Sequence, residues 1–150
     1  MSHTIIPTED SDIEELLRSV REVNLEEAVA KGFNPAAIMS STLARSRAHW
    51  TGRVGSELVA VWGVEAETLL SRDGFLWLCT THAIIKHQFV FIKYSKKFIQ
   101  KISEEFDLLW GVVDDDFDDS KRWLRWLGFT IFPPVKVNKK FICRFEKRIR

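Results

Sequence analysis

The stretch "SKRWLRWLGF" (residues 120–129) combines two tryptophans and three cations with an abrupt Gly-Phe ending. At about 100° per residue, Trp123, Leu124 and Leu127 share one helical face, and the three cations fall on the opposite side. Gly128 stands where the end of a helix needs a positive φ. Three turns are few for an autonomous membrane-surface helix. The stretch therefore predicts an amphipathic helix that packs on a core and leads directly into a strand.

The segments on both sides of this helix have the period of strands. "DLLWGVV" (107–113) reads as a buried strand, and the aspartates that follow lie where the dipole of the next helix favours negative charge. "FTIFPPVKVNKKFICRFEKR" (129–148) predicts two strands around a Pro-Pro bend and an Asn-Lys turn. Upstream, apolar residues from Gln88 to Phe106 step by three and four, which predicts a long helix with lysines on its solvent side.

The first half of the chain predicts the remaining elements. A helix should run from an N-cap at Thr8 to a stop at Gly32, and a second should begin at Asn34 with a first-turn proline. A first strand (3–7), a β-hairpin around Gly55 and a third strand (75–81) complete the pattern. The resulting order is β-α-α-β-β-β-α-β-α-β-β.

The strand–helix–strand succession over 75–113 predicts one parallel strand pair with a right-handed crossover, inside a sheet otherwise built from hairpins. The fold class is therefore α/β: a single domain over residues 1–150, with a mixed, mostly antiparallel sheet and helices on both faces. A chain of 150 residues has enough length for one such core.

Composition restricts the cellular setting. No apolar run reaches the roughly 20 residues that span a bilayer, and the N-terminus lacks the pattern of a signal peptide. Cys79 and Cys143 both lie in strand-like apolar runs and are predicted to be buried free thiols, which suits a reducing cytosol. We therefore expect a cytoplasmic protein without a membrane partner.

The net charge of +1 conceals an uneven distribution. Residues 120–150 carry ten Lys or Arg against the single Glu146, so this stretch has a local charge of +9 and the rest sums to −8. Two interpretations stay open: solvated charge on exposed strand faces, or weak contact of the basic C-terminal third with nucleic acid, through phosphates and base stacking.

The sequence motifs give little support for a metal site or a cysteine nucleophile. "DDDFDDS" (114–120) lacks the mid-loop glycine of a calcium loop, and its twelfth position is Arg125 in place of a glutamate. The four histidines have no zinc spacing. Cys79 is read as a core residue and not as a nucleophile for His82.

The element order, the start "HTIIPTEDSDIEELL" (3–17) and the helix ending in Gly-Phe resemble the GNAT acetyltransferase superfamily over nearly the whole chain. "LWGVVDDDFDDSKRWLRWLGFTI" (109–131), "TTHAIIKH" (80–87) and the strand before the acidic turn are similar to the GNAT-like internal virion proteins of short-tailed podophages. The resemblance implies acetyl-CoA as cofactor, an amine acceptor, and a location in the host cytoplasm or the phage virion.

The same resemblance indicates where a site would lie. The family binds the CoA pyrophosphate with a glycine-containing loop after the fourth strand. Here that region contains no glycine between Gly74 and Gly111, so Thr80, Thr81, Lys86 and His87 are the candidate cofactor ligands. His82 is the candidate general base.

The family's general acid is a tyrosine four residues before the glycine of Gly-Phe, a position that is Leu124 here. Two functions therefore remain. One is a divergent or inactive acetyltransferase fold that serves in the virion or in contact with a host protein. The other is an active acetyl-CoA-dependent N-acetyltransferase that acts on a primary amine.

Overall fold

A computed structural model describes residues 3–19 and 34–150 of the chain. Its elements divide into two compact units. Unit 1 comprises Met1–Glu65 and Trp77–Phe91, and unit 2 comprises Ala66–Leu76 and Ile92–Arg150. Within the described residues, no helix is both long and apolar enough to cross a membrane.

Unit 1 contains the predicted N-terminal strand, helices and hairpin. They are β1 (His3–Ile6), α1 (Asp10–Ser19), α3 (Pro35–Arg45), β2 (Ser46–Val54), β3 (Glu57–Glu65), the second half of β4 (Asp73–Thr80) and the short α4 (Ala83–Lys86). Asn34 caps α3 as predicted, because its Oδ1 accepts a hydrogen bond from the Ala36 N–H at 3.0 Å. Helix α1 begins at Asp10, two residues after the predicted cap Thr8, and the predicted stop at Gly32 lies outside the described residues.

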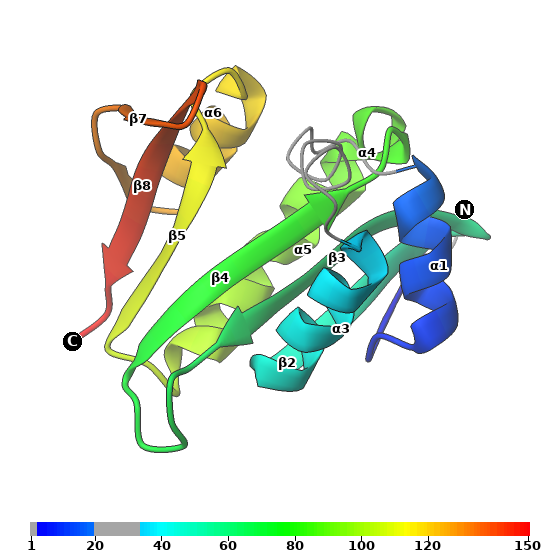
Figure 1. Cartoon of the computed structure of the whole chain (residues 1–150), viewed down its shortest axis with the longest axis horizontal. Helices are drawn as coiled ribbons and strands as arrows, with labels where there is room; N and C mark the ends of the chain where they lie inside the picture. Colours follow the sequence, from blue (N-terminus) through cyan, green and yellow to red (C-terminus); the bar gives the residue numbers. More distant parts are fainter. Residues whose placement is uncertain (1–2, 20–33) are drawn as a thin grey trace. The chain divides into compact units, whose positions relative to one another are not determined.

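The strands of unit 1 follow the order β1-β2-β3-β4. β1 and β3 both pair antiparallel with β2, and Gly55 forms the hairpin turn with φ of 60°. Figure 1 shows α1 and α3 on the same face of this hairpin. Their buried side chains pack with β3 in one cluster that contains Ile13, Leu16, Met39, Leu58 and Val61.

Unit 2 contains the rest of the sheet and the late helix. Its elements are the first half of β4, most of α5 (Gln88–Ser103), β5 (Leu108–Asp114), α6 (Asp118–Trp126), β6 (Thr130–Ile131), β7 (Val135–Val137) and β8 (Lys140–Arg148). β4 pairs parallel with β5 from Asp73↔Leu108 to Phe75↔Trp110, so the predicted parallel pair is confirmed. β5 pairs antiparallel with β8, and β6 and β7 both pair with β8.

Two details differ from the sequence prediction. The segment after α6 forms two short strands before β8 where one was predicted, because Pro133 and Pro134 interrupt the pairing and proline has no N–H to donate. The strand β4 is central as predicted, but most of its side chains are half-buried instead of fully covered.

The opening stretch folds as the pattern predicts. Leu124 in α6 and the C-cap residue Leu127 are buried, and Gly128 has φ of 95°. The buried Phe129 packs edge-on against Phe145 with ring centroids 5.2 Å apart. Lys121 is an exception to the predicted solvent side: it is 14% exposed and its Nζ lies 2.9 Å from Asp115.

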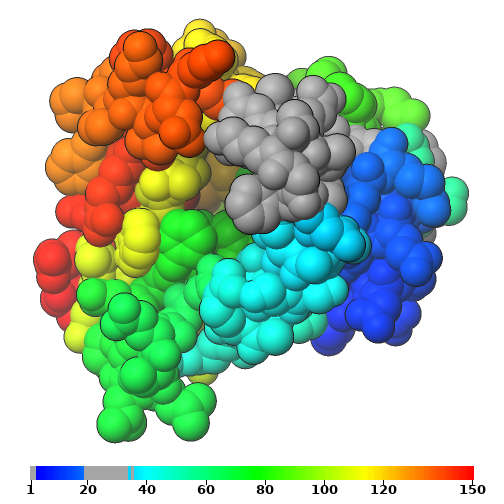
Figure 2. Space-filling view, viewed as in Figure 1, coloured from blue at the N-terminus to red at the C-terminus, as the bar shows by residue number. Residues whose placement is uncertain are grey.

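The loop between β3 and β4 projects from the surface (Figure 2). Leu69 and Leu70 in this loop are 91% and 89% exposed. Their side chains therefore add nothing to the core of unit 2.

Candidate functional site at the end of strand β4

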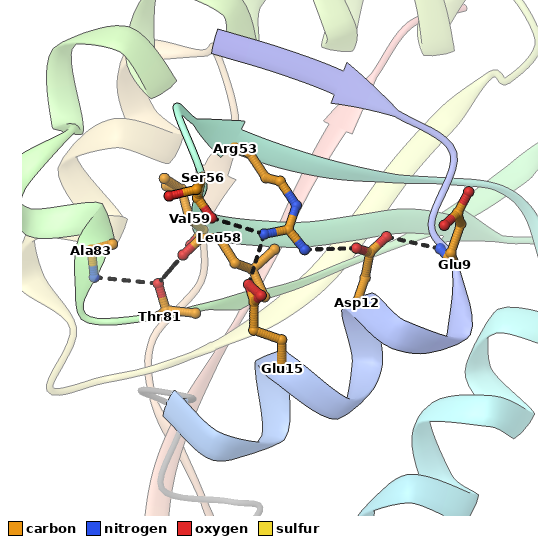
Figure 3. Close-up of polar contacts among 9 residues, drawn as sticks. All are labelled: Glu9, Asp12, Glu15, Arg53, Ser56, Leu58, Val59, Thr81 and Ala83. Atoms are coloured by element: carbon orange, nitrogen blue, oxygen red, sulfur yellow. Dashed lines mark hydrogen bonds and ion pairs between the residues drawn. The ribbon is translucent and has the colours of Figure 1, made fainter. Parts of the chain in front are cut away.

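The end of β4 is joined to β3 by hydrogen bonds of Thr81. Thr80 and Thr81 are both buried. The Thr81 hydroxyl donates to the Leu58 carbonyl oxygen at 2.6 Å (Figure 3). The Thr81 N–H donates to the Val59 carbonyl oxygen at 3.0 Å. Thr81 therefore uses both of its donors to hold the strand end in place.

The amide donors that follow β4 are also used inside the chain. The Ala83 N–H donates to the Thr81 hydroxyl oxygen at 3.3 Å, which Figure 3 shows. The Ile84 N–H donates to the Thr81 carbonyl oxygen at 3.1 Å, and the Ile85 N–H to the His82 carbonyl oxygen at 3.3 Å. A tight helical turn, anchored by the buried Ile84, thus forms where an open loop would present these N–H groups to a ligand.

Glu57, at the start of β3, pairs with the two basic candidates. Its Oε1 lies 2.9 Å from Lys86 Nζ and 3.0 Å from His87 Nε2. Hydrogen bonds from His87 and then from Lys86 lower the pKa of the Glu57 carboxyl. His87 is buried in this arrangement, whereas Lys86 is exposed. No local pattern of the sequence indicates Glu57, because about thirty residues separate it from its partners.

The structure thus places all five predicted site residues in one short segment. Thr80 and Thr81 end the strand, His82 precedes α4 with an exposed side chain, and Lys86 and His87 close the turn. The side chains of Lys86 and His87 meet at Glu57. His82 carries the only imidazole of this segment that is open to solvent.

A second charged cluster in unit 1 was not predicted. Arg53 lies between two carboxylates of α1: its Nη2 is 2.8 Å from Asp12 Oδ1 and its Nη1 is 2.7 Å from Glu15 Oε2 (Figure 3). Arg53 also donates to the Ser56 carbonyl oxygen. Burial alone would raise the pKa of Asp12, but hydrogen bonds, chiefly from Arg53, lower it. Arg53 therefore joins α1 to the hairpin turn.

Unit 2 contains the position of the family's general acid and the acidic turn. Leu124 is buried in α6, and the only tyrosine of the sequence, Tyr94, lies on α5. After β5, Asp115 accepts from Lys121 at 2.9 Å and from the Cys143 thiol at 3.4 Å. Burial raises the pKa of the Cys143 thiol, and Cys143 is the buried free thiol that was predicted. Cys79 is a free thiol as well, but it is only half-buried, so the prediction of burial was wrong there. Among the described residues, no cluster of three or more His, Cys, Asp or Glu side chains could hold a metal ion.

Comparison with known proteins identifies the fold. No protein-family model and no curated protein matches the sequence. Among solved structures, Ard1 from Thermoplasma volcanium is similar with a TM-score of 0.75 at 13% identity, over 99% of this chain and 98% of that one. The ribosomal-protein-S18-alanine N-acetyltransferase from Escherichia coli has a TM-score of 0.72 at 12% identity, over 99% and 94% of the two chains.

A third solved structure is yncA from Salmonella typhimurium with its cofactor acetyl-CoA. It has a TM-score of 0.64 at 13% identity, over 100% of this chain and 95% of that one. The chain therefore has the fold of the GNAT acetyltransferases, as the sequence predicted.

Proposed function

We propose that this chain uses the acetyltransferase fold for binding, in a phage virion or in contact with a host protein, and does not transfer acetyl groups. The observation that carries the proposal is that the polar groups of the segment after β4 already have partners inside the chain. Lys86 and His87 share Glu57, and the N–H groups of Ala83, Ile84 and Ile85 bond within the chain.

The pyrophosphate of CoA needs donors that are free to receive it. Helix N-termini and glycine loops bind phosphates because their N–H groups point at the anion without internal partners. Here the N–H groups of Ala83, Ile84 and Ile85 already have acceptors. Glu57 would in addition place a negative charge beside the anion, which is repulsive. These residues do not fit the pyrophosphate group.

The chemistry of acetyl transfer also lacks a participant. The leaving thiolate of CoA takes up a proton from a general acid, which in the family is a tyrosine of the late helix. Leu124 stands at that position, and a hydrocarbon side chain has no proton to donate.

The proposed role in a virion or at a host protein rests on the similarity of residues 109–131 to internal virion proteins of podophages.

An active N-acetyltransferase is the second candidate, and one observation favours it. The chain shares its fold over its entire length with a protein solved with acetyl-CoA. In that case the exposed His82 would take the proton from the acceptor amine.

Thermal denaturation with 1 mM acetyl-CoA separates the two candidates. We expect no rise of Tm. A ligand at a hundredfold excess over its Kd stabilises a protein by about 2.7 kcal/mol, so binding would be plain to see and would contradict the proposal. Mass spectrometry of purified phage particles tests the virion role: absence of the protein from the particles restricts the proposal to the host partner.

A further inference from the structure

The surface formed by α5 and α6 in unit 2 carries six cations without an acidic partner. On α5 these are Lys93, Lys96, Lys97 and Lys101, and on α6 they are Arg122 and Arg125. All six are exposed, and none forms an ion pair with a carboxylate of residues 3–19 or 34–150. We call these six residues, together with Tyr94 and Trp126, the α5–α6 face.

The cations lie close together on this face. At about 100° per residue, the four lysines of α5 occupy an arc of about 140°, and successive i, i+4 lysines are about 6 Å apart along the axis. Trp123 Nε1 donates to Ser95 Oγ at 3.0 Å, which fixes α6 beside α5. Arg122 and Arg125 precede Trp126 by four residues and one residue on α6.

Aromatic rings lie among these cations. Lys96 Nζ is 5.3 Å from the centroid of the Trp126 ring, and Trp126 is 52% exposed. Lys93 Nζ and Lys97 Nζ lie 5.6 and 5.7 Å from the centroid of Tyr94. Each aromatic ring is thus bordered by at least one ammonium group.

We propose that the α5–α6 face binds single-stranded nucleic acid. A row of uncompensated cations supplies the counter-charge for consecutive phosphates. An exposed tryptophan beside them supplies a surface on which a base can stack, whatever its sequence. An acidic peptide would use the cations but would leave the Trp126 ring without a stacking partner, so the observations favour nucleic acid. This surface lies outside the segment after β4, and the proposal holds whether or not acetyl-CoA binds there.

The test measures fluorescence anisotropy of a labelled 20-nucleotide oligo(dT) at several salt concentrations with the full chain. We expect salt-dependent binding that quenches tryptophan fluorescence. The triple variant Lys93→Glu, Lys97→Glu, Lys101→Glu should lower the slope of log K against log salt by about 2, since each lost phosphate contact accounts for about 0.7 in a single strand. Trp126→Ala should weaken binding at least fivefold, the lower end of about 1–3 kcal/mol per stacked base.

Matched controls keep the test specific. The triple variant Lys136→Glu, Lys139→Glu, Arg148→Glu changes the net charge by the same amount in β7, β8 and the turn between them, and Phe141→Ala removes a ring on β8 that is 52% exposed, as Trp126 is. Both controls should bind as the native chain does. The proposal fails if oligo(dT) does not bind at 50 mM salt, if the control triple loses as much affinity, or if polyglutamate or anionic vesicles bind equally well and Trp126→Ala has no effect.

Discussion

The segment after β4 and the α5–α6 face differ in whether their basic side chains have an acidic partner. In the first, Lys86 and His87 both meet the carboxylate of Glu57 within 3.0 Å. In the second, none of the six cations forms an ion pair with a carboxylate of the described residues, and three of the lysines lie against aromatic rings. In the segment after β4 the chain supplies the counter-charge itself, whereas the helices of unit 2 leave their charge open.

Cations of the first kind stabilise the fold through ion pairs, whereas those of the second kind have a charge available for a binding partner. An ion pair that joins distant segments stabilises the native state, and removing one member leaves the other without its counter-charge. A row of like charges repels itself and costs a little stability. Substitution of a cation should therefore destabilise unit 1 and slightly stabilise the α5–α6 face.

The largest effect is expected for Arg53→Ala. Asp12 is 5% exposed, so loss of Arg53 leaves a buried carboxylate without its cation, and unfolding free energy should fall by about 3 kcal/mol. Urea unfolding followed by circular dichroism measures this loss. The control Arg45→Ala removes a cation whose side chain is 58% exposed beside Glu65 and should cost less than about 1 kcal/mol. Equal losses for the two variants would contradict the role given to Arg53.

A smaller effect should appear on acidification. The pKa of Asp12 is lowered in the folded state, so its stabilising contribution is complete above the unfolded value of about 3.9 and is lost as the pH falls through the lower folded value. The loss should be smaller than for Arg53→Ala, because a protonated Asp12 leaves no bare charge in the interior. Urea unfolding between pH 2 and 6 should show a step that is absent in Asp12→Asn; identical pH profiles of the two proteins would refute this assignment.

The sequence predicted those parts of the fold that depend on local patterns. The spacing of Leu124 and Leu127, the positive φ at Gly128 and the Asn34 cap all follow from a few adjacent residues, and each is confirmed. The pattern failed at the second strand of the C-terminal segment, where it indicated the Pro-Pro bend but not that pairing with β8 resumes on both sides of it.

The partners of the candidate site could not be predicted because they come from distant parts of the sequence. Glu57 reaches Lys86 and His87 across about thirty residues, and Arg53 reaches Asp12 across forty-one. Such pairs depend on which strands become neighbours and in which register, which no local periodicity specifies. The lysine row on α5 was visible in the sequence, but the Trp126 ring beside Lys96 required the packing of α6 on α5.

Glu57→Gln tests whether Glu57 closes the segment after β4. Removing the negative charge of Glu57 removes its repulsion of a bound anion, so the affinity for the anion should rise severalfold. We expect calorimetry to show this gain for inorganic pyrophosphate. Glu65→Gln removes a carboxylate that pairs with Arg45 elsewhere in unit 1 and should change nothing. If both variants gain equally, net charge explains the result and Glu57 does not block the site.

The smallest effect, and the one of opposite sign, is expected for Lys97→Gln. Lys97 lies four residues from both Lys93 and Lys101, and like charges at this spacing cost about 0.2–0.5 kcal/mol per pair. Neutralising Lys97 should therefore raise the unfolding free energy by about 0.5 kcal/mol in low salt, and the gain should shrink in 0.5 M NaCl as screening increases. Gln100→Ala on the same helix changes no charge and should show no salt-dependent gain. A loss of stability in Lys97→Gln would mean that a counter-charge or the Tyr94 ring stabilises this lysine by more than the repulsion costs, and the contrast between the two regions would no longer hold.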